Sequence, residues 1–128
     1  MRVLVDTHAF LWAAGDTGRL SELARTVLID PSNELMFSAA SAFEIAVKAA
    51  KGHLGLPDAT DRFLATRLPA LGMTELAITT RHAVAAAALP AIHSDPWDRL
   101  LVAQAQLEGL TILTSDIQVR RYDVETIW

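Results

Sequence analysis

The sequence predicts an α/β fold of three layers, α/β/α, with a mostly parallel central sheet. Two observations support this: short apolar runs alternate with helical patterns along the chain, and the connections between them are brief. Strands that alternate with helices in this way form parallel sheets covered by helices on both faces. With 128 residues and 52% hydrophobic composition, we expect a single domain over residues 1–128.

The expected strands are short and apolar or β-branched, over residues 3–5, 34–37, 73–77 and 110–113, with an edge strand in the tail 122–128. Helical spacing of apolar residues predicts helices over residues 7–14, 21–29, 38–51, 59–71, 80–89 and 96–108. Gly15, Gly52 and Gly109 follow the ends of three of these helices. Pro69 is expected to end the helix over 59–71 early.

Composition limits the classes of function. A net charge of −4 argues against a broad basic face that grips nucleic acid by neutralising phosphates. The chain has no cysteine, which excludes disulfides, thiolate metal sites and cysteine nucleophiles and fits a reducing compartment. The longest apolar run, Ala83 to Leu89, is too short to cross a membrane, and Asp6 interrupts any signal-peptide core. We therefore expect a soluble, cytoplasmic protein without a membrane partner.

Acidic residues stand where a parallel sheet would gather them. Asp6 directly follows the first strand, and Asp116 comes shortly after the strand over 110–113. Glu44 and Asp98 lie in the expected first turns of helices. Ligands of open parallel sheets bind in the crevice beyond the carboxyl ends of the strands. We therefore expect these acids to converge in one site.

Most of these acids also have a structural alternative that needs no chemistry. Asp6 can cap the helix that follows it, and Asp116 can be a turn residue. Glu44 fits a capping box with Ser41, or it can pair with Lys48 one helical turn later. The sequence alone leaves these alternatives open.

Carboxylates that converge need a counter-charge. At about 4 Å, each pair repels by roughly 1 kcal/mol in water and by about 4 kcal/mol at an effective dielectric of about 20. Oxygen-only ligands select hard cations such as Mg²⁺ or Mn²⁺, and no cysteine is present to draw zinc. One divalent ion would change the formal charge from −4 to −2 and let a phosphate approach. The chemistry expected of such a site is metal-assisted phosphodiester hydrolysis.

The motifs around the acids form an ordered set: VDTHAFLW with Asp6, SAFEIAVK with Glu44, HSDPWDRLLVAQA with Asp98, and TILTSD with Asp116. With these motifs, nearly the whole chain resembles the PIN-domain ribonucleases, and most closely the VapC-type toxins of type II toxin–antitoxin systems. The resemblance implies a PIN-like fold in which the four acids are catalytic and bind Mg²⁺ or Mn²⁺. It also implies that Thr114 or Ser115 helps to position metal or water.

The resemblance implies partners as well. They are an RNA substrate, a second copy of the chain in a homodimer whose acidic sites share a groove, and a cognate antitoxin protein that blocks the site. One departure is Trp97 in the DPWDR block, where phenylalanine is more usual. We expect this change to alter packing more than catalysis.

The block around Asp98 contains supporting residues with two possible roles each. Asp95, Pro96 and Asp98 suit the cap, first position and third position of a helix, and Asp95 can also support the site. Arg99 can contact the scissile phosphate or anchor Asp98 through a salt bridge.

Other histidines and arginines are further candidates for a functional role. His8 and His93 stand close to acids in the sequence, but oxygen-rich Mg²⁺ sites rarely recruit imidazole. His82 has no partner visible in the sequence. Arg120 and Arg121 form the adjacent basic pair and suit an RNA backbone contact, although an exposed pair near a chain end is usually only solvated.

Two other functions remain open at this point. A non-catalytic PIN-like module could bind metal or RNA without turnover. A haloacid dehalogenase-like phosphatase would use Asp6 as a covalent nucleophile, but it normally needs a second aspartate two positions on, where this chain has His8.

Overall fold

The computed structural model describes residues 1–128 and contains a five-stranded sheet in which all neighbouring strands run parallel. Its strands are β1 (Arg2–Val5), β2 (Glu34–Ser38), β3 (Met73–Leu76), β4 (Thr111–Leu113) and β5 (Thr126–Ile127). They lie in the order β3-β2-β1-β4-β5, so β1 is central and the tail forms the edge strand β5. The predicted α/β class is confirmed, and the sheet is parallel throughout.

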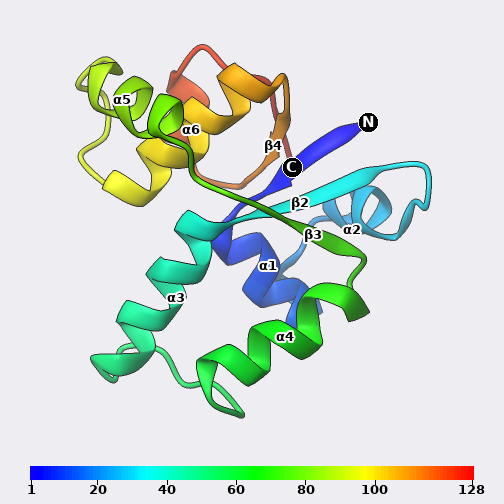
Figure 1. The fold of residues 1–128 in the computed structure, drawn as a ribbon. Helices are drawn as coiled ribbons and strands as arrows, with labels where there is room; N and C mark the ends of the chain where they lie inside the picture. The colour runs from blue at the N-terminus through cyan, green and yellow to red at the C-terminus, as the bar shows by residue number, and fades with distance from the viewer.

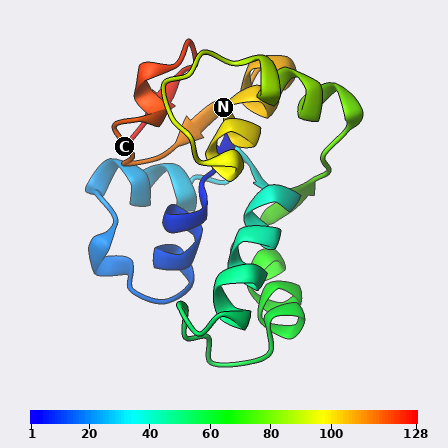
Figure 2. The ribbon, with the colours of Figure 1, turned by 90° about the vertical axis from the view of Figure 1, so that its left-hand side faces the viewer.

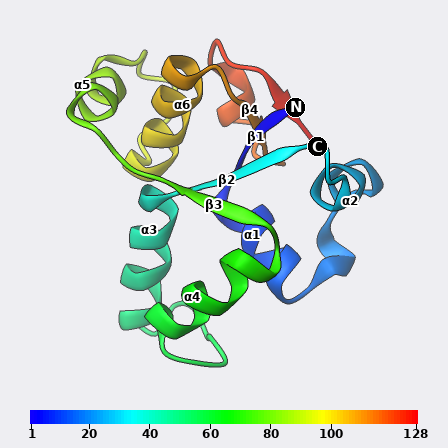
Figure 3. The same ribbon diagram turned by 45° about the vertical axis from the view of Figure 1, so that its right-hand side comes forward.

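Helices cover both faces of this sheet. They are α1 (Thr7–Ala14), α2 (Glu22–Ile29), α3 (Ala39–Ala50), α4 (Thr60–Ala70), α5 (Thr80–Ala88) and α6 (Pro96–Glu108), with short 3₁₀ turns η1 (Thr17–Arg19) and η2 (Val119–Arg121). In Figure 1, α5 and α6 lie above the sheet and α1, α3 and α4 lie below it. Figure 3 shows α2 beside the other end of the strands. The longest helix has 13 residues, and none has the length and apolar character that a membrane span requires.

The two faces of the sheet bury separate apolar clusters. In the central strand β1, Val3 and Val5 pack into the cluster formed with α1 to α4, whereas Leu4 packs into the cluster formed with α6. The neighbouring strand β2 alternates in the same way, with Phe37 on the first face and Met36 on the second. Because side chains alternate along a strand, a strand covered on both faces must be apolar at successive positions. This explains the continuous apolar runs of the sequence.

The helix ends follow the stop residues in most cases. Gly109 ends α6 in the left-handed region at φ 66°, where glycine carries no steric penalty. One prediction is wrong: Pro69 does not end α4 early, because this helix continues to Ala70. Pro69 lies in the last turn, so its missing N–H removes a hydrogen bond at a terminus, where helices are already frayed.

A buried polar contact holds α6 to the start of α3. Gln104, which is fully buried in α6, accepts a hydrogen bond from the Ser38 hydroxyl at 2.5 Å and donates one to the Ala77 carbonyl at 3.2 Å. Ser38 is also the N-cap of α3 and accepts from the N–H of Ala40 at 3.0 Å. The two helices that carry Glu44 and Asp98 are therefore fixed relative to one another.

His82 has partners that the sequence did not reveal. It is 2% exposed, its Nδ1 accepts from the N–H of Thr79 at 3.0 Å, and its Nε2 lies 2.8 Å from Oε1 of Glu108. Because Nδ1 accepts, Nε2 carries the proton that is donated to Glu108. The ring joins the start of α5 to the end of α6.

We expect Gln104→Leu to lower the free energy of unfolding by about 2–3 kcal/mol, because it removes the buried acceptor of the Ser38 hydroxyl and the side-chain donor to the Ala77 carbonyl. In thermal denaturation this corresponds to a decrease in Tm of roughly 5–12 °C. Gln106→Leu is the matched control on the same helix, since Gln106 is exposed and contacts only the Asp123 carbonyl. Equal Tm values for the two variants would contradict this account.

Candidate metal centre

The carboxyl ends of the strands meet at one edge of the sheet, and Figure 2 views the molecule from that side, where α1, α3 and α6 begin. Asp6 and Asp116 follow β1 and β4, which are neighbours in the sheet. Asp98 lies in the first turn of α6. Glu44 lies past the first turn of α3, because this helix begins at Ala39. All four predicted acids are therefore on elements that begin or end at this edge.

Asp6 is buried at the end of the central strand. Its backbone N–H continues the ladder to the Leu113 carbonyl at 3.2 Å, and its Oδ1 caps α1 by accepting from the N–H of Ala9 at 2.7 Å. Burial raises the pKa of the Asp6 carboxyl, while hydrogen bonds from the Thr114 side chain and from Ala9 act in the opposite direction. The repulsion of Asp116 adds to the increase in this pKa. The capping alternative is correct, and the cap leaves Asp6 within the field of Asp116.

Asp116 is held in a turn by its own backbone and side chain. Its N–H donates to the hydroxyl of Thr114 at 3.0 Å, and its Oδ1 accepts from the N–H of Gln118 at 2.8 Å. Thr114 is fully buried and connects Asp6 with Asp116 through its side-chain hydrogen bonds, whereas the next residue, Ser115, is partly exposed. The turn alternative for Asp116 is also correct, and it leaves Oδ2 directed toward the side of the site that contains His93.

Glu44 is 3% exposed and has two polar neighbours. The Thr7 hydroxyl donates to its Oε1 at 2.7 Å, and Lys48 forms an ion pair with its Oε2 at 2.5 Å. The capping box with Ser41 is wrong, because Ser38 is the N-cap of α3 and Ser41 lies inside the helix, 2.8 Å from the Thr7 hydroxyl. Lys48 therefore supplies the counter-charge of Glu44.

Asp98, Asp116 and His93 form the tightest group of possible ligands. One ligand atom from each lies within 4.8 Å of the others. His93 Nε2 is 3.0 Å from Oδ2 of Asp98 and 4.0 Å from Oδ2 of Asp116. Asp6 and Glu44 border this group without belonging to it.

Burial and negative neighbours leave Asp98 poorly stabilised as an anion. Burial, followed by the charges of Asp95, Asp116 and Glu44, raises the pKa of Asp98 to about 7. The hydrogen bond to His93 acts in the opposite direction and lowers this pKa. Each of these acids therefore lies close enough to repel Asp98. This excess of negative charge on oxygen ligands fits a hard divalent cation, which would be held by Asp98 and Asp116 and would have to displace a proton.

His93 is the site residue that the sequence analysis undervalued. Its backbone N–H donates to the hydroxyl of the buried Tyr122 at 2.9 Å, and this hydroxyl donates back to the His93 carbonyl at 3.3 Å. The loop before α6 is thereby held against η2, and the ring reaches the acids. The HSDPWD motif indicated this contact, because His93 and Asp98 are five residues apart and stand on either side of the helix cap Asp95.

The supporting residues are placed as follows. Asp95 caps α6 by accepting from the N–H groups of Trp97 and Asp98, at 2.9 and 3.2 Å. Arg99 does not form the expected salt bridge with Asp98, because its guanidinium binds backbone carbonyls at the end of α5, including those of Ala86 and Leu89 at 2.9 Å each. The carbonyls left free at a helix end explain this position.

Comparison with known proteins identifies the class that this fold and site define. The PIN domain family matches residues 3–125, and the chain belongs to that family. Its relatives include Ribonuclease VapC22 of Mycobacterium tuberculosis, 32% identical over 121 residues that cover 94% of this chain and 91% of that protein. The family resemblance stated from the sequence motifs is confirmed.

Solved structures show the same fold. VapBC2 from Rickettsia felis bound to a DNA fragment from their promoter is 14% identical, with a TM-score of 0.70 and coverage of 99% of this chain and 98% of that chain. A toxin–antitoxin complex from Klebsiella pneumoniae is 21% identical, with a TM-score of 0.63 and coverage of 98% and 96%. At these identities the likeness concerns the fold.

We expect Asp98→Asn to stabilise the metal-free protein at pH 8. The pKa of Asp98 is raised from 3.8 to about 7 in the folded state, so folding favours the protonated acid, and the associated stability is lost as pH rises through about 7. Asparagine mimics the protonated form, so Tm in chelator should rise by roughly 5 °C at pH 8 and be unchanged below about pH 4, where the acid is protonated in both states.

The control for this experiment is Asp61→Asn on α4, which removes an equal charge from an exposed position away from the site. It should leave Tm unchanged at both pH values. A lower Tm for Asp98→Asn than for the parent at pH 8 would contradict the charge repulsion inferred here.

Proposed function

We propose that residues 1–128 form a single nuclease domain that hydrolyses RNA phosphodiester bonds with a divalent metal ion, as the VapC-type toxin of a toxin–antitoxin pair. The observation that carries this proposal is the Asp98–Asp116–His93 group, with ligand atoms within 4.8 Å of one another at the edge of a PIN fold. The relationship to Ribonuclease VapC22 supports RNA as the substrate.

The four acids have different duties in this proposal. Asp98 and Asp116 bind the ion directly, because their carboxylates have oxygens within 4.8 Å of each other and form no ion pair with a lysine or arginine. Asp6 contributes negative charge through its proximity to Asp116. Glu44 joins the site when the ammonium group of Lys48 moves away from its carboxylate. Alternatively, Glu44 acts on a water that lies between its carboxylate and the ion.

The metal is Mg²⁺ or Mn²⁺, and the donor set supports this choice because it is dominated by carboxylate oxygens. When bound, such an ion supplies Lewis acidity toward a phosphoryl oxygen and a water of lowered pKa. The Thr114 hydroxyl keeps Asp6 and Asp116 in place, and Ser115 lies beside them. Asp95 fixes the first turn of α6 and thus the direction of Asp98.

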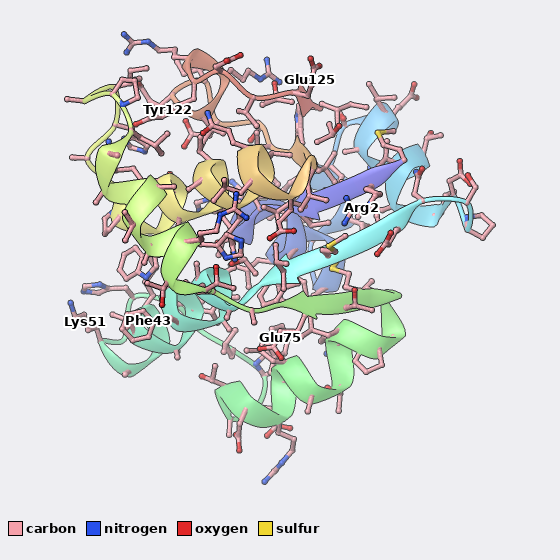
Figure 4. All side chains as sticks on the ribbon, turned by 45° about the horizontal axis from the view of Figure 1, so that its top comes forward. Arg2, Phe43, Lys51, Glu75, Tyr122 and Glu125 are labelled. Carbon is pink, nitrogen blue, oxygen red and sulfur yellow. The ribbon has the colours of Figure 1, made fainter.

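Protein partners follow from the same relationship. We propose a homodimer and a cognate antitoxin, and this chain shares its fold with a solved toxin–antitoxin complex. Exposed apolar side chains offer surface for such contacts: Phe43 on α3 is 63% exposed, and Ile29 at the end of α2 is 79% exposed. Figure 4 shows Phe43 and Lys51 on the outer side of α3.

Cleavage of a pool of labelled RNAs tests the proposed function. We expect cleavage with Mn²⁺ or Mg²⁺, none in chelator, and a decrease of about two orders of magnitude for Asp6→Asn and for Asp98→Asn, because each removes charge from the metal centre. Asp61→Asn is the control, and it should cleave as the parent does.

Two outcomes would refute parts of this proposal. Binding of RNA without cleavage under any of these conditions would favour a non-catalytic PIN-like module. Full activity of Asp6→Asn would contradict the proposed role of the Asp6 carboxylate in the reaction.

A further inference from the structure

An open cavity of about 630 Å³ lies directly beside the metal centre. Its polar lining residues are His93 and Ser94 of the loop before α6, Arg99 in α6, and Gln118 and Arg121 in the segment after β4. His93 belongs to both sites, since its ring contacts Asp98 while the residue lines the cavity. The cavity therefore adjoins the metal centre through His93.

The charge of the cavity is opposite to that of the protein. The chain has a net charge of −4, but no carboxylate lines this cavity, and two arginines do. Neither Arg99 nor Arg121 forms an ion pair with a carboxylate: Arg99 binds carbonyl oxygens such as that of Pro90 at 2.9 Å, and Arg121 binds the side-chain oxygen of Gln118 at 3.0 Å. Both positive charges are thus uncompensated.

Of the two arginines, Arg121 is the one with guanidinium nitrogens that have no protein acceptor. Only its Nη1 has a protein acceptor, so Nε and Nη2 remain available, whereas the nitrogens of Arg99 are engaged by several carbonyls. A planar guanidinium with free donors matches the oxygens of a phosphate group. The oxygen of Gln118 orients this guanidinium on the side of the cavity.

The walls of the cavity are fixed by the metal centre itself. Asp116 accepts from the N–H of Gln118 through its side chain, and its carbonyl accepts from the N–H of Arg120 at 3.3 Å. Tyr122, labelled in Figure 4, follows Arg121 and joins the turn to the backbone of His93 through its hydroxyl. The turn that precedes Arg121 is therefore held next to the acids by short, defined contacts.

We propose that this cavity is a phosphate subsite, in which Arg121 binds a backbone phosphodiester of the RNA strand next to the scissile bond. The proposal rests on the proposed ribonuclease function and specifies where its substrate lies. The subsite compensates for the acidic centre, because a polyanion that approaches a net-negative protein gains a local positive contact there.

The test compares Arg121→Gln with Arg120→Gln, its exposed neighbour, which does not line the cavity. Binding of a labelled single-stranded RNA is measured by fluorescence anisotropy in chelator, where the strand stays intact, and KM and kcat are measured with Mn²⁺. Both series are run between about 50 and 200 mM salt.

For Arg121→Gln we expect Kd and KM to rise by about 5–10-fold, with kcat within about twofold of the parent. The slope of log Kd against log salt concentration should decrease by about 0.7, as for one lost contact to a single strand. Arg121→Lys should recover part of the affinity because it keeps the charge. Arg120→Gln should stay within about twofold of the parent in every measurement.

Equal losses for Arg120→Gln and Arg121→Gln would overturn the subsite, since they would indicate a general field effect. Parent-like affinity and KM for Arg121→Gln would overturn it too, while parent cleavage would leave the proposed function standing. If the parent binds RNA but does not cleave it, the ribonuclease function fails, and the affinities alone decide the subsite. A parent that neither binds RNA in chelator nor cleaves it with Mn²⁺ refutes both.

Discussion

Parallel pairing of all five strands is the constraint on which the other features of this molecule depend. It brings the carboxyl ends of β1 and β4 together, so the acids that follow them must share one edge of the sheet. Helices that start at the same edge add Glu44 and Asp98. The result is a concentration of negative charge at this edge, where Asp6 and Glu44 are buried and Asp98 and Asp116 are partly exposed.

The fold tolerates this charge by giving most of the acids a separate partner. Asp6 accepts a helix N–H, Asp116 accepts a turn N–H, and Glu44 pairs with Lys48. Asp98 has His93 as its only side-chain partner and three negative neighbours, and burial followed by these charges raises its pKa to about 7. The cost of assembling the site therefore falls on Asp6 and Asp98, whose pKa values are both raised, and a cation bound beside them would offset the repulsion.

Two carboxylates at the acidic edge of the sheet also cap helices. Asp6 starts α1 and belongs to the acidic site, and Asp95 starts α6 while it orients Asp98. Arg99 ends α5 by binding its free carbonyls, although it stands next to an acid in the sequence. A structural duty of a residue is thus no argument against a functional one, because helix ends and strand ends meet where an open parallel sheet binds its ligands.

The sequence by itself determined the elements and their order, because alternation, helical spacing and stop residues act over short distances in the chain: the helix over 96–108 is present as predicted. It also identified the acids and the family, through motifs that need no knowledge of distance. Only the tertiary structure decided that His93 reaches Asp98, that Lys48 neutralises Glu44, and that Arg99 faces α5. These outcomes depend on side-chain directions across packed helices and loops, where one turn of a helix or one capped loop changes which partner is within reach.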